Sequence, residues 1–369
     1  MNILMHINSA GMKCTVLSFA VSLLAACGGG SDGSTPSAVT TTHCAYVANF
    51  RSHNVSQYAV STGGTLTAMH TPTVEAGANP YSITVDPSRQ YAYVANLSSN
   101  NISQYTIGAA GVLTAMATST VAAGTTPEFI VVHPFGKYAY VTNFTSNNIS
   151  QFNIGADGAL SPMTTATATA GTNPFSITID PSGKYAYVAN YTSNDISQYN
   201  IGADGALSPM TKATVTAGMN PFFIAVEPSG QYVYVANQTG NNISQYNIGA
   251  DGALTPMTIP AVAAGAGPHS VTFDPFGKYA YVANLYSDNV SQYTIAANGA
   301  LTAMPTATVK AGTTPTSITV DSLGKNVYVA NYTSNDISQY IIGGDGALTP
   351  ISKTTIDAGF GPVSVIYLQ

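Results

Sequence analysis

The sequence predicts an all-β fold, a seven-bladed β-propeller with four antiparallel strands in each blade. Three observations carry this prediction: a 47-residue repeat, an alternation of side chains with a period of two, and two chain ends that complete each other. The phrase Tyr-Val-Ala-Asn occurs seven times, with Thr142 in place of Ala in the third copy, and its asparagines are Asn49, Asn96, Asn143, Asn190, Asn237, Asn284 and Asn331. A repeat of this length matches one four-stranded blade.

Each repeat is expected to contain two hairpins. In the unit that begins at Pro174, the expected elements in order are a strand over 174–180, a Pro/Gly turn over 181–184, a strand over 185–190, a polar loop over 191–195, a strand over 196–201, and a strand over 207–215. The last two strands are separated by Asp204-Gly205, which suits a type I′ turn. Four such strands make one blade.

The two ends of the repeat region predict how the ring closes. The first unit begins on its second strand, with Cys44-Ala45-Tyr46-Val47, and the chain finishes with a lone first strand over 362–368. The C-terminal strand is expected to pair beside the N-terminal one and to hide edges that an open sheet would expose. Seven copies at one spacing leave no room for another domain, so we expect a single propeller over 44–369.

Composition excludes several classes of function. Hydrophobic residues make up 45% of the chain, which is ample for a core. With 10 Lys and Arg against 16 Asp and Glu, the net charge is -6, and no basic stripe exists to neutralise a phosphate backbone. Nucleic acid is therefore excluded as a partner. All three cysteines lie in the first 44 residues, so the repeats have no disulfide framework.

The N-terminal segment has the pattern of an export signal. Lys13 precedes an apolar run over 15–24 that is too short to span a bilayer as a helix. The run ends in Leu24-Ala25-Ala26-Cys27, which resembles the bacterial lipobox, and a Gly/Ser tether follows. An ordinary signal peptide that contains a cysteine is the alternative. We expect a signal over 1–26, lipid on Cys27, a flexible linker over 27–43, and outer-membrane anchoring through the lipid alone, because the residue after the cysteine is Gly.

The repeated phrases resemble a known family. Tyr-Val-Ala-Asn, Asn-Asn-Ile-Ser-Gln-Tyr, Asp-Gly-Ala-Leu and Asp-Pro-Ser-Gly-Lys-Tyr-Ala-Tyr-Val resemble the YVTN-type repeats of bacterial surface-layer proteins and the seven-bladed lactonase family typified by 6-phosphogluconolactonase. The resemblance covers residues 44–369. It implies that the strand Pro-x-Ser-Ile-Thr-Val lines the central channel, and that hydrolysis of a lactone is one possible activity.

Differences between the repeats concentrate at one position. The residue after the proline that opens each inner strand is, in order, Tyr81, Glu128, Phe175, Phe222, His269, Thr316 and Val363. We expect these side chains to form a variable rim at the channel mouth, on the face that carries the loops after each Tyr-Val-Ala-Asn. Two interpretations stay open: a ligand or partner site, for which the candidates are Tyr81, Glu128, Phe175, Phe222, His269 and Thr316, or solvent-exposed residues that vary freely after duplication.

The rim offers two candidates for catalysis, Glu128 and His269, because a lactonase needs a general base and a group that stabilises an oxyanion. They stand three blades apart, so in a wide channel we do not expect them to share one substrate atom. In the lactonase family one blade carries Gly-Pro-Arg-His. The corresponding segment here is Gly267-Pro268-His269-Ser270, so His269 takes the arginine position and Ser270 the histidine position.

Two functions from different classes follow. The first is a cell-envelope lipoprotein whose propeller binds an envelope protein, a glycan or a small neutral ligand at the rim or on the polar loops. The second is a lactonase-like hydrolase that acts in the central channel. We expect no cofactor and no metal site, since the six histidines show neither the spacing nor the neighbouring carboxylates of a metal site.

Overall fold

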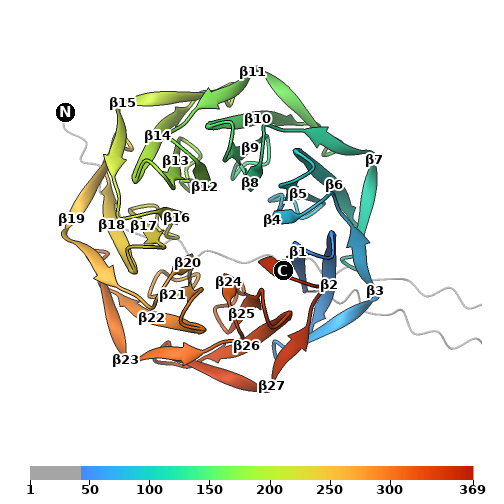
Figure 1. Ribbon diagram of the computed structural model, residues 1–369, viewed down its shortest axis with the longest axis vertical. Coiled ribbons are helices and arrows are strands. Elements are labelled where there is room, and N and C mark those ends of the chain that lie inside the picture. The colour runs from blue at the N-terminus through green and yellow to red at the C-terminus, as the bar shows by residue number, and fades with distance from the viewer. Residues whose placement is uncertain (1–42, 369) are drawn as a thin grey trace, which may run out of the picture. The chain divides into compact units, whose positions relative to one another are not determined.

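The computed structural model describes residues 43–368, which form a ring of seven four-stranded antiparallel sheets around a central axis (Figure 1). The predicted seven-bladed propeller is therefore confirmed. The predicted signal over 1–26 and all of the linker except residue 43 lie outside the described residues. From His43 to Leu368, no helix is long and apolar enough to cross a membrane.

The blades follow the repeats, and their strands run from the channel outward in the order given. Blade 1 contains β28 (Pro362–Leu368), β1 (Cys44–Asn49), β2 (Asn54–Val60) and β3 (Leu66–Glu75). Blade 2 contains β4 (Pro80–Val85), β5 (Tyr91–Asn96), β6 (Asn101–Ile107) and β7 (Leu113–Ala122). Blade 3 contains β8 (Pro127–Val132), β9 (Tyr138–Asn143), β10 (Asn148–Ile154) and β11 (Leu160–Thr169). Blade 4 contains β12 (Pro174–Ile179), β13 (Tyr185–Asn190), β14 (Asp195–Ile201) and β15 (Leu207–Thr216).

The remaining three blades repeat this order. Blade 5 contains β16 (Pro221–Val226), β17 (Tyr232–Asn237), β18 (Asn242–Ile248) and β19 (Leu254–Ala263). Blade 6 contains β20 (Pro268–Phe273), β21 (Tyr279–Asn284), β22 (Asn289–Ile295) and β23 (Leu301–Lys310). Blade 7 contains β24 (Pro315–Val320), β25 (Asn326–Asn331), β26 (Asp336–Ile342) and β27 (Leu348–Asp357). The strand bounds predicted for blade 4 agree with these to within one residue.

The ring closes in blade 1, as the chain ends predicted. Strand β28 pairs antiparallel with β1, with Cys44 opposite Leu368 and Ala48 opposite Ser364. The two ends of the repeat region thus complete one sheet, and the inner edge of β1 is covered. Val363 and Val365 of β28 are buried, so the closing strand also contributes to the core.

A repeated glutamine binds each blade to the next. In blade 4, Gln198 is fully buried. Its Nε2 donates to Lys212 O at 2.8 Å, across an irregularity in the pairing of β14 with β15. Its Oε1 accepts from Leu254 N of blade 5 at 2.7 Å. Equivalent bonds from the side-chain oxygen to the next blade join every neighbouring pair. Both polar ends of the glutamine are therefore satisfied inside the protein.

The tyrosine of Tyr-Val-Ala-Asn makes a second link between blades. Each hydroxyl donates to the carbonyl oxygen of a turn glycine in the following blade, at 2.5 to 2.8 Å, as Tyr187 does to Gly252. The asparagine that ends the phrase is also used within its blade, where Asn190 Nδ2 donates to Asp195 and Ser197. The polar residues that repeat most faithfully are thus structural, and we call these positions the frame.

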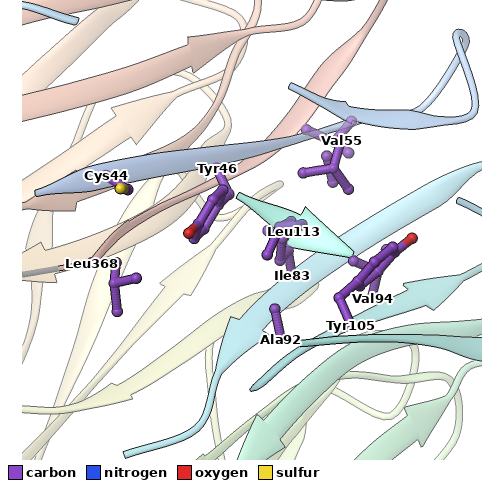
Figure 2. Close-up of a cluster of buried hydrophobic side chains, with 11 residues drawn as sticks. Cys44, Tyr46, Val55, Ile83, Ala92, Val94, Tyr105, Leu113 and Leu368 are labelled. Carbon is purple, nitrogen blue, oxygen red and sulfur yellow. The ribbon is translucent and has the colours of Figure 1, made fainter. Parts of the chain in front are cut away.

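The hydrophobic core lies between blades rather than in one central mass. The cluster in Figure 2 joins blades 1 and 2, where Tyr46 and Val55 pack against Ile83, Val94 and Leu113. Six further clusters fill the other blade interfaces. Because a buried aliphatic side chain stabilises by about 1.5 to 3 kcal/mol, each interface contributes substantially to the ring.

Candidate functional site

The residue that varies between repeats lies in a β-bulge. In blade 2, Pro80 pairs with Asn96 and Ser82 pairs with Ala95, so Tyr81 between them has no partner in the ladder. The same irregularity occurs in every blade. A bulge leaves one residue unpaired and redirects its side chain, which explains why this position tolerates six residue types in seven blades.

The bulge side chains fill much of the channel mouth instead of lining it as an exposed rim. Phe175 and Phe222 are 8% and 7% exposed, and their ring centroids are 3.7 Å apart. His269 packs on Phe222 with centroids 3.8 Å apart, and Tyr81 meets Phe175 edge-on at 5.6 Å. Of the two interpretations of this position, the one with solvent-exposed side chains does not hold, because the inner strands approach closely enough for aromatic rings to meet in the channel.

A second layer closes the channel below this one. Phe129 and Phe223 follow the bulge residues of blades 3 and 5, and their rings meet edge-on with centroids 5.5 Å apart. The space left between the two layers is about 30 Å³, enough for about one water molecule. Sequence reasoning missed this pair, although the signal was present: a phenylalanine stands where the other blades have serine.

The phenylalanine at 129 is accommodated by the one change in the Tyr-Val-Ala-Asn phrase. In other blades the serine after the bulge residue accepts from a backbone N–H of the next inner strand, as Ser270 does from Ile318 at 3.4 Å. Thr142 pairs with Phe129 in the ladder, and its hydroxyl donates to Phe175 O of the next blade at 2.7 Å. A hydroxyl on the neighbouring strand thus also links this blade to the next one, but as a donor to a carbonyl and not as an acceptor from an N–H.

One part of the mouth stays open. A cavity of about 250 Å³ lies over blades 6, 7, 1 and 2, and we call it the mouth cavity; its lining residues are Phe50, Tyr81, His269, Leu285, Thr314, Thr316, Tyr332 and Val363. None of these side chains carries a fixed charge. Phe50, Leu285 and Tyr332 were missed from the sequence; each directly follows a Tyr-Val-Ala-Asn phrase, at the loop position nearest the channel.

His269 is the most chemically distinctive residue of the mouth cavity. Its Nδ1 lies 2.6 Å from Thr316 O, and because a carbonyl oxygen only accepts, Nδ1 carries the proton and donates. Burial lowers the pKa of His269 to about 4, even though the Thr316 carbonyl opposes that shift. The imidazole is therefore neutral at pH 7, with its remaining lone pair on Nε2.

Glu128 lies apart from the mouth cavity. It is 5% exposed, its Oε2 has no hydrogen-bond partner, and it lines neither of the two spaces at the mouth. Burial raises its pKa to about 8. Burial, together with the Glu128 carboxyl, also raises the pKa of Tyr81 well above its usual range, so both groups hold their protons at pH 7. Glu128 and His269 are thus not brought together in one cavity.

The other predicted rim residues divide between the two spaces. Tyr81, His269 and Thr316 line the mouth cavity, whereas Phe175 and Phe222 line only the small space between the aromatic layers. Thr316 is itself held in place, since its hydroxyl lies 3.0 Å from Pro362 O and 3.1 Å from Ala330 O. Over residues 43–368, no group of three or more His, Cys, Asp or Glu side chains is placed to hold a metal ion.

Comparisons with known proteins agree with this architecture. The family model for the lactonase seven-bladed β-propeller matches residues 4–264 and 258–315, more than half of the chain. A search of curated protein sequences gave no match.

Solved structures show the same fold at low sequence identity. A candidate 6-phosphogluconolactonase from Bacteroides fragilis aligns with a TM-score of 0.79 at 23% identity, covering 91% of this chain and 100% of that one. The periplasmic gluconolactonase PpgL of Pseudomonas aeruginosa aligns at 0.78 and 16%, covering 89% and 99%. A protein from Lactobacillus plantarum aligns at 0.78 and 20%, covering 89% and 100%. The family-model match over more than half of the chain shows that the chain belongs to the lactonase family of seven-bladed β-propellers.

Proposed function

We propose that this chain binds a small, non-phosphorylated lactone in the mouth cavity and hydrolyses it with His269. The single observation that carries the proposal is the state of that histidine. A neutral imidazole has its Nδ1 fixed by Thr316 O in an uncharged cavity, so Nε2 is the ring nitrogen left for a water or a ligand.

Family membership supports a lactone as the substrate class. Two of the three structural neighbours described above carry lactonase names, one as a candidate 6-phosphogluconolactonase and one as a periplasmic gluconolactonase. A phosphorylated substrate is disfavoured, because no lysine or arginine lines the mouth cavity. At about 250 Å³ the cavity is also smaller than the roughly 300 to 1,000 Å³ typical of drug-sized ligands, which suits a single ring.

The proposed chemistry is general-base hydrolysis. His269 Nε2 takes a proton from the water that attacks the lactone carbonyl. As the ring C–O bond breaks, the imidazolium returns that proton to the departing ring oxygen, so the product is a hydroxy acid and His269 is neutral again. The Tyr81 hydroxyl, which stays protonated because its pKa is raised, is available as a donor to the developing oxyanion. Glu128 takes no part, since it does not line the cavity.

We further propose that the protein works in the cell envelope, exported by residues 1–26 and anchored in the outer membrane by lipid on Cys27. The lipobox-like run and the Gly/Ser tether support this address. A neighbour described as periplasmic is compatible with it.

A second candidate is a propeller that binds an envelope protein, a glycan or a small neutral ligand without catalysis. The observation that favours it is the replacement of the Arg-His pair of the family by His269 and Ser270. The neutral polar loops on the same face would then provide the contact surface.

Hydrolysis by the mature chain decides between the two candidates. We would assay residues 28–369 against neutral five- and six-membered lactones and gluconolactone, with His269→Gln and a matched His53→Asn control. His53 Nδ1 accepts from Asn79 N at 2.9 Å, the role that asparagine has in neighbouring blades, so this control retains the fold. We expect turnover by the wild type and the control, and a fall of about 10²-fold or more in His269→Gln. No turnover by the wild type would reject the hydrolase and favour the second candidate, a propeller that binds without catalysis.

A further inference from the structure

One loop beside the mouth cavity differs from its counterparts by a positive charge. The residue that follows Phe50 is Arg51, whereas the corresponding loop residues are Ser98, Thr145, Thr192, Thr239, Tyr286 and Thr333. Arg51 is exposed, and Phe50 lines the cavity. Arg51 is therefore the one positively charged residue among the seven equivalent loop positions, and its neighbour in the chain lines the mouth cavity.

Arg51 is held at the edge of the cavity by one of its lining residues. Its Nε donates to the Tyr332 hydroxyl at 3.1 Å, and its Cζ lies 4.7 Å from the centre of the Tyr332 ring. This arrangement combines a hydrogen bond with a cation–π contact and restricts a side chain that is otherwise flexible. A guanidinium positioned in advance binds an anion with less loss of conformational entropy.

The charge of Arg51 is not neutralised within the described part of the chain. No carboxylate between His43 and Leu368 forms an ion pair with it, and among these residues Nε is its only N–H group with an acceptor. The nearby loop carboxylates are used elsewhere: Asp288 accepts from Thr314 N at 2.7 Å, and Asp336 accepts from Asn331 Nδ2 at 2.7 Å. Both Nη groups therefore remain for a ligand, in the planar fork that matches a carboxylate.

We propose that Arg51 binds a carboxylate of the ligand, so that the site takes a small lactone bearing an acid group. The uncharged ring lies in the mouth cavity and the acid reaches the edge at Arg51. A carboxylate suits this edge better than a phosphate, because one guanidinium balances its single negative charge, whereas a phosphate monoester carries nearly two and no second cation lines the cavity. The inference rests on the proposed lactone site and adds the substituent that the site selects.

The test compares two ligands with the same lactone ring, one with a carboxylate and one with the uncharged methyl ester in its place. 5-Oxotetrahydrofuran-2-carboxylate and its methyl ester are titrated calorimetrically into the mature chain, and into Arg51→Gln, Arg51→Lys and Lys310→Gln variants. Lys310 is an exposed residue on the same face, so its variant removes one positive charge without touching the cavity. Circular dichroism checks that each variant is folded.

We expect the wild type and Lys310→Gln to bind the acid at least about 10-fold more tightly than the ester, as a charge-assisted hydrogen bond implies. Arg51→Gln should abolish this preference, and Arg51→Lys should retain part of it. Equal binding of acid and ester by the wild type, an unchanged preference in Arg51→Gln, or no binding of either compound would overturn the inference. Hydrolysis is measured separately. Tighter binding of the acid without turnover would support the role of Arg51 and reject the proposed catalysis. Turnover with equal binding of acid and ester would support the catalysis and reject the role of Arg51.

Discussion

The frame and the mouth of this propeller are built from the same repeat, yet they differ in how their residues are constrained. Gln198 of the frame is bonded to its own blade and to the next one, and every blade keeps an equivalent residue. Tyr81 of the mouth stands in a bulge with no ladder partner, and its counterparts differ from blade to blade. Residues that join blades are thus uniform, whereas residues released by the bulge are free to take up a function.

The mouth itself divides into a filled part and an open part. On blades 4 and 5, Phe175 and Phe222 pack against each other, and the loop residue Tyr191 meets Phe222 edge-on with ring centroids 6.2 Å apart. Over blades 6, 7, 1 and 2, smaller residues such as Thr316 and Val363 leave the mouth cavity open. The residue at the bulge position therefore determines whether a part of the mouth is filled by aromatic rings or left open as a cavity.

The largest expected effect comes from breaking the frame at its closure. Removing residues 364–369 deletes most of β28, including the buried Val365 and Leu368, and exposes the inner edge of β1. Losing buried side chains and the strand pairing should lower the free energy of unfolding by roughly 5 kcal/mol or more. Thermal unfolding measures the effect, with deletion of residues 28–33 of the linker as the control. Equal melting of the two truncated proteins would contradict ring closure by β28.

The pH dependence of stability tests whether Glu128, the bulge residue of blade 3, is buried with its proton. The pKa of this carboxyl rises from 4.5 to about 8 in the fold. Between these values the unfolded chain has released the proton that the folded chain still holds, so the contribution of Glu128 to stability falls as the pH rises. At about 1.4 kcal/mol for each pH unit, the loss reaches on the order of 4 kcal/mol by pH 8.

Urea unfolding at pH 5 and pH 8 checks this sign. Glu128→Gln should reduce the loss of stability between the two pH values, while the exposed Glu75→Gln should leave it as in the wild type. A wild type that gains stability relative to Glu128→Gln on going from pH 5 to pH 8 would show that the buried carboxyl is ionised and paired.

A substitution within the frame should lower the stability of the protein without changing its affinity for the lactone. Gln198→Ala removes a buried side chain that makes two hydrogen bonds and leaves Leu254 N without its acceptor. We expect a loss of about 2 to 3 kcal/mol in urea unfolding, because buried polar groups lose their partners. Asn200→Ala, an exposed change on the same strand, is the control. A Gln198→Ala protein with altered lactone affinity and unchanged stability would reverse the distinction between frame and mouth.

The smallest effect comes from blade 3, which lacks one hydrogen bond to the preceding blade that the other six blades make. In six blades a tyrosine hydroxyl on the third strand donates to a carbonyl of the preceding blade, as Tyr199 does to Thr169 O at 2.6 Å; blade 3 has Phe152 instead. Phe152→Tyr should restore the bond to Ala122 O and stabilise the ring by about 1 kcal/mol. A destabilised variant would mean that blade 3 packs differently from the other six at this point.

The fold was predictable from the sequence because its determinants are local and repeated. The alternation in Ile196-Ser197-Gln198-Tyr199, the Asp-Gly turns and the incomplete first and last units specify strands, hairpins and closure. The candidate site was predictable only in part. The variable position could be found by comparing repeats, but its burial depends on the width of the channel, and Phe50 and Tyr332 join His269 only when four blades meet in space.

The most direct test of where the function lies is a crystal structure with the lactam analogue of the carboxylate lactone, which resists hydrolysis. We expect the lactam ring in the mouth cavity, in contact with His269 and Tyr332, and the carboxylate on Arg51. A ligand bound to the polar loops or to the outer strands, with the mouth cavity empty, would contradict the claim that the open part of the mouth is the functional site.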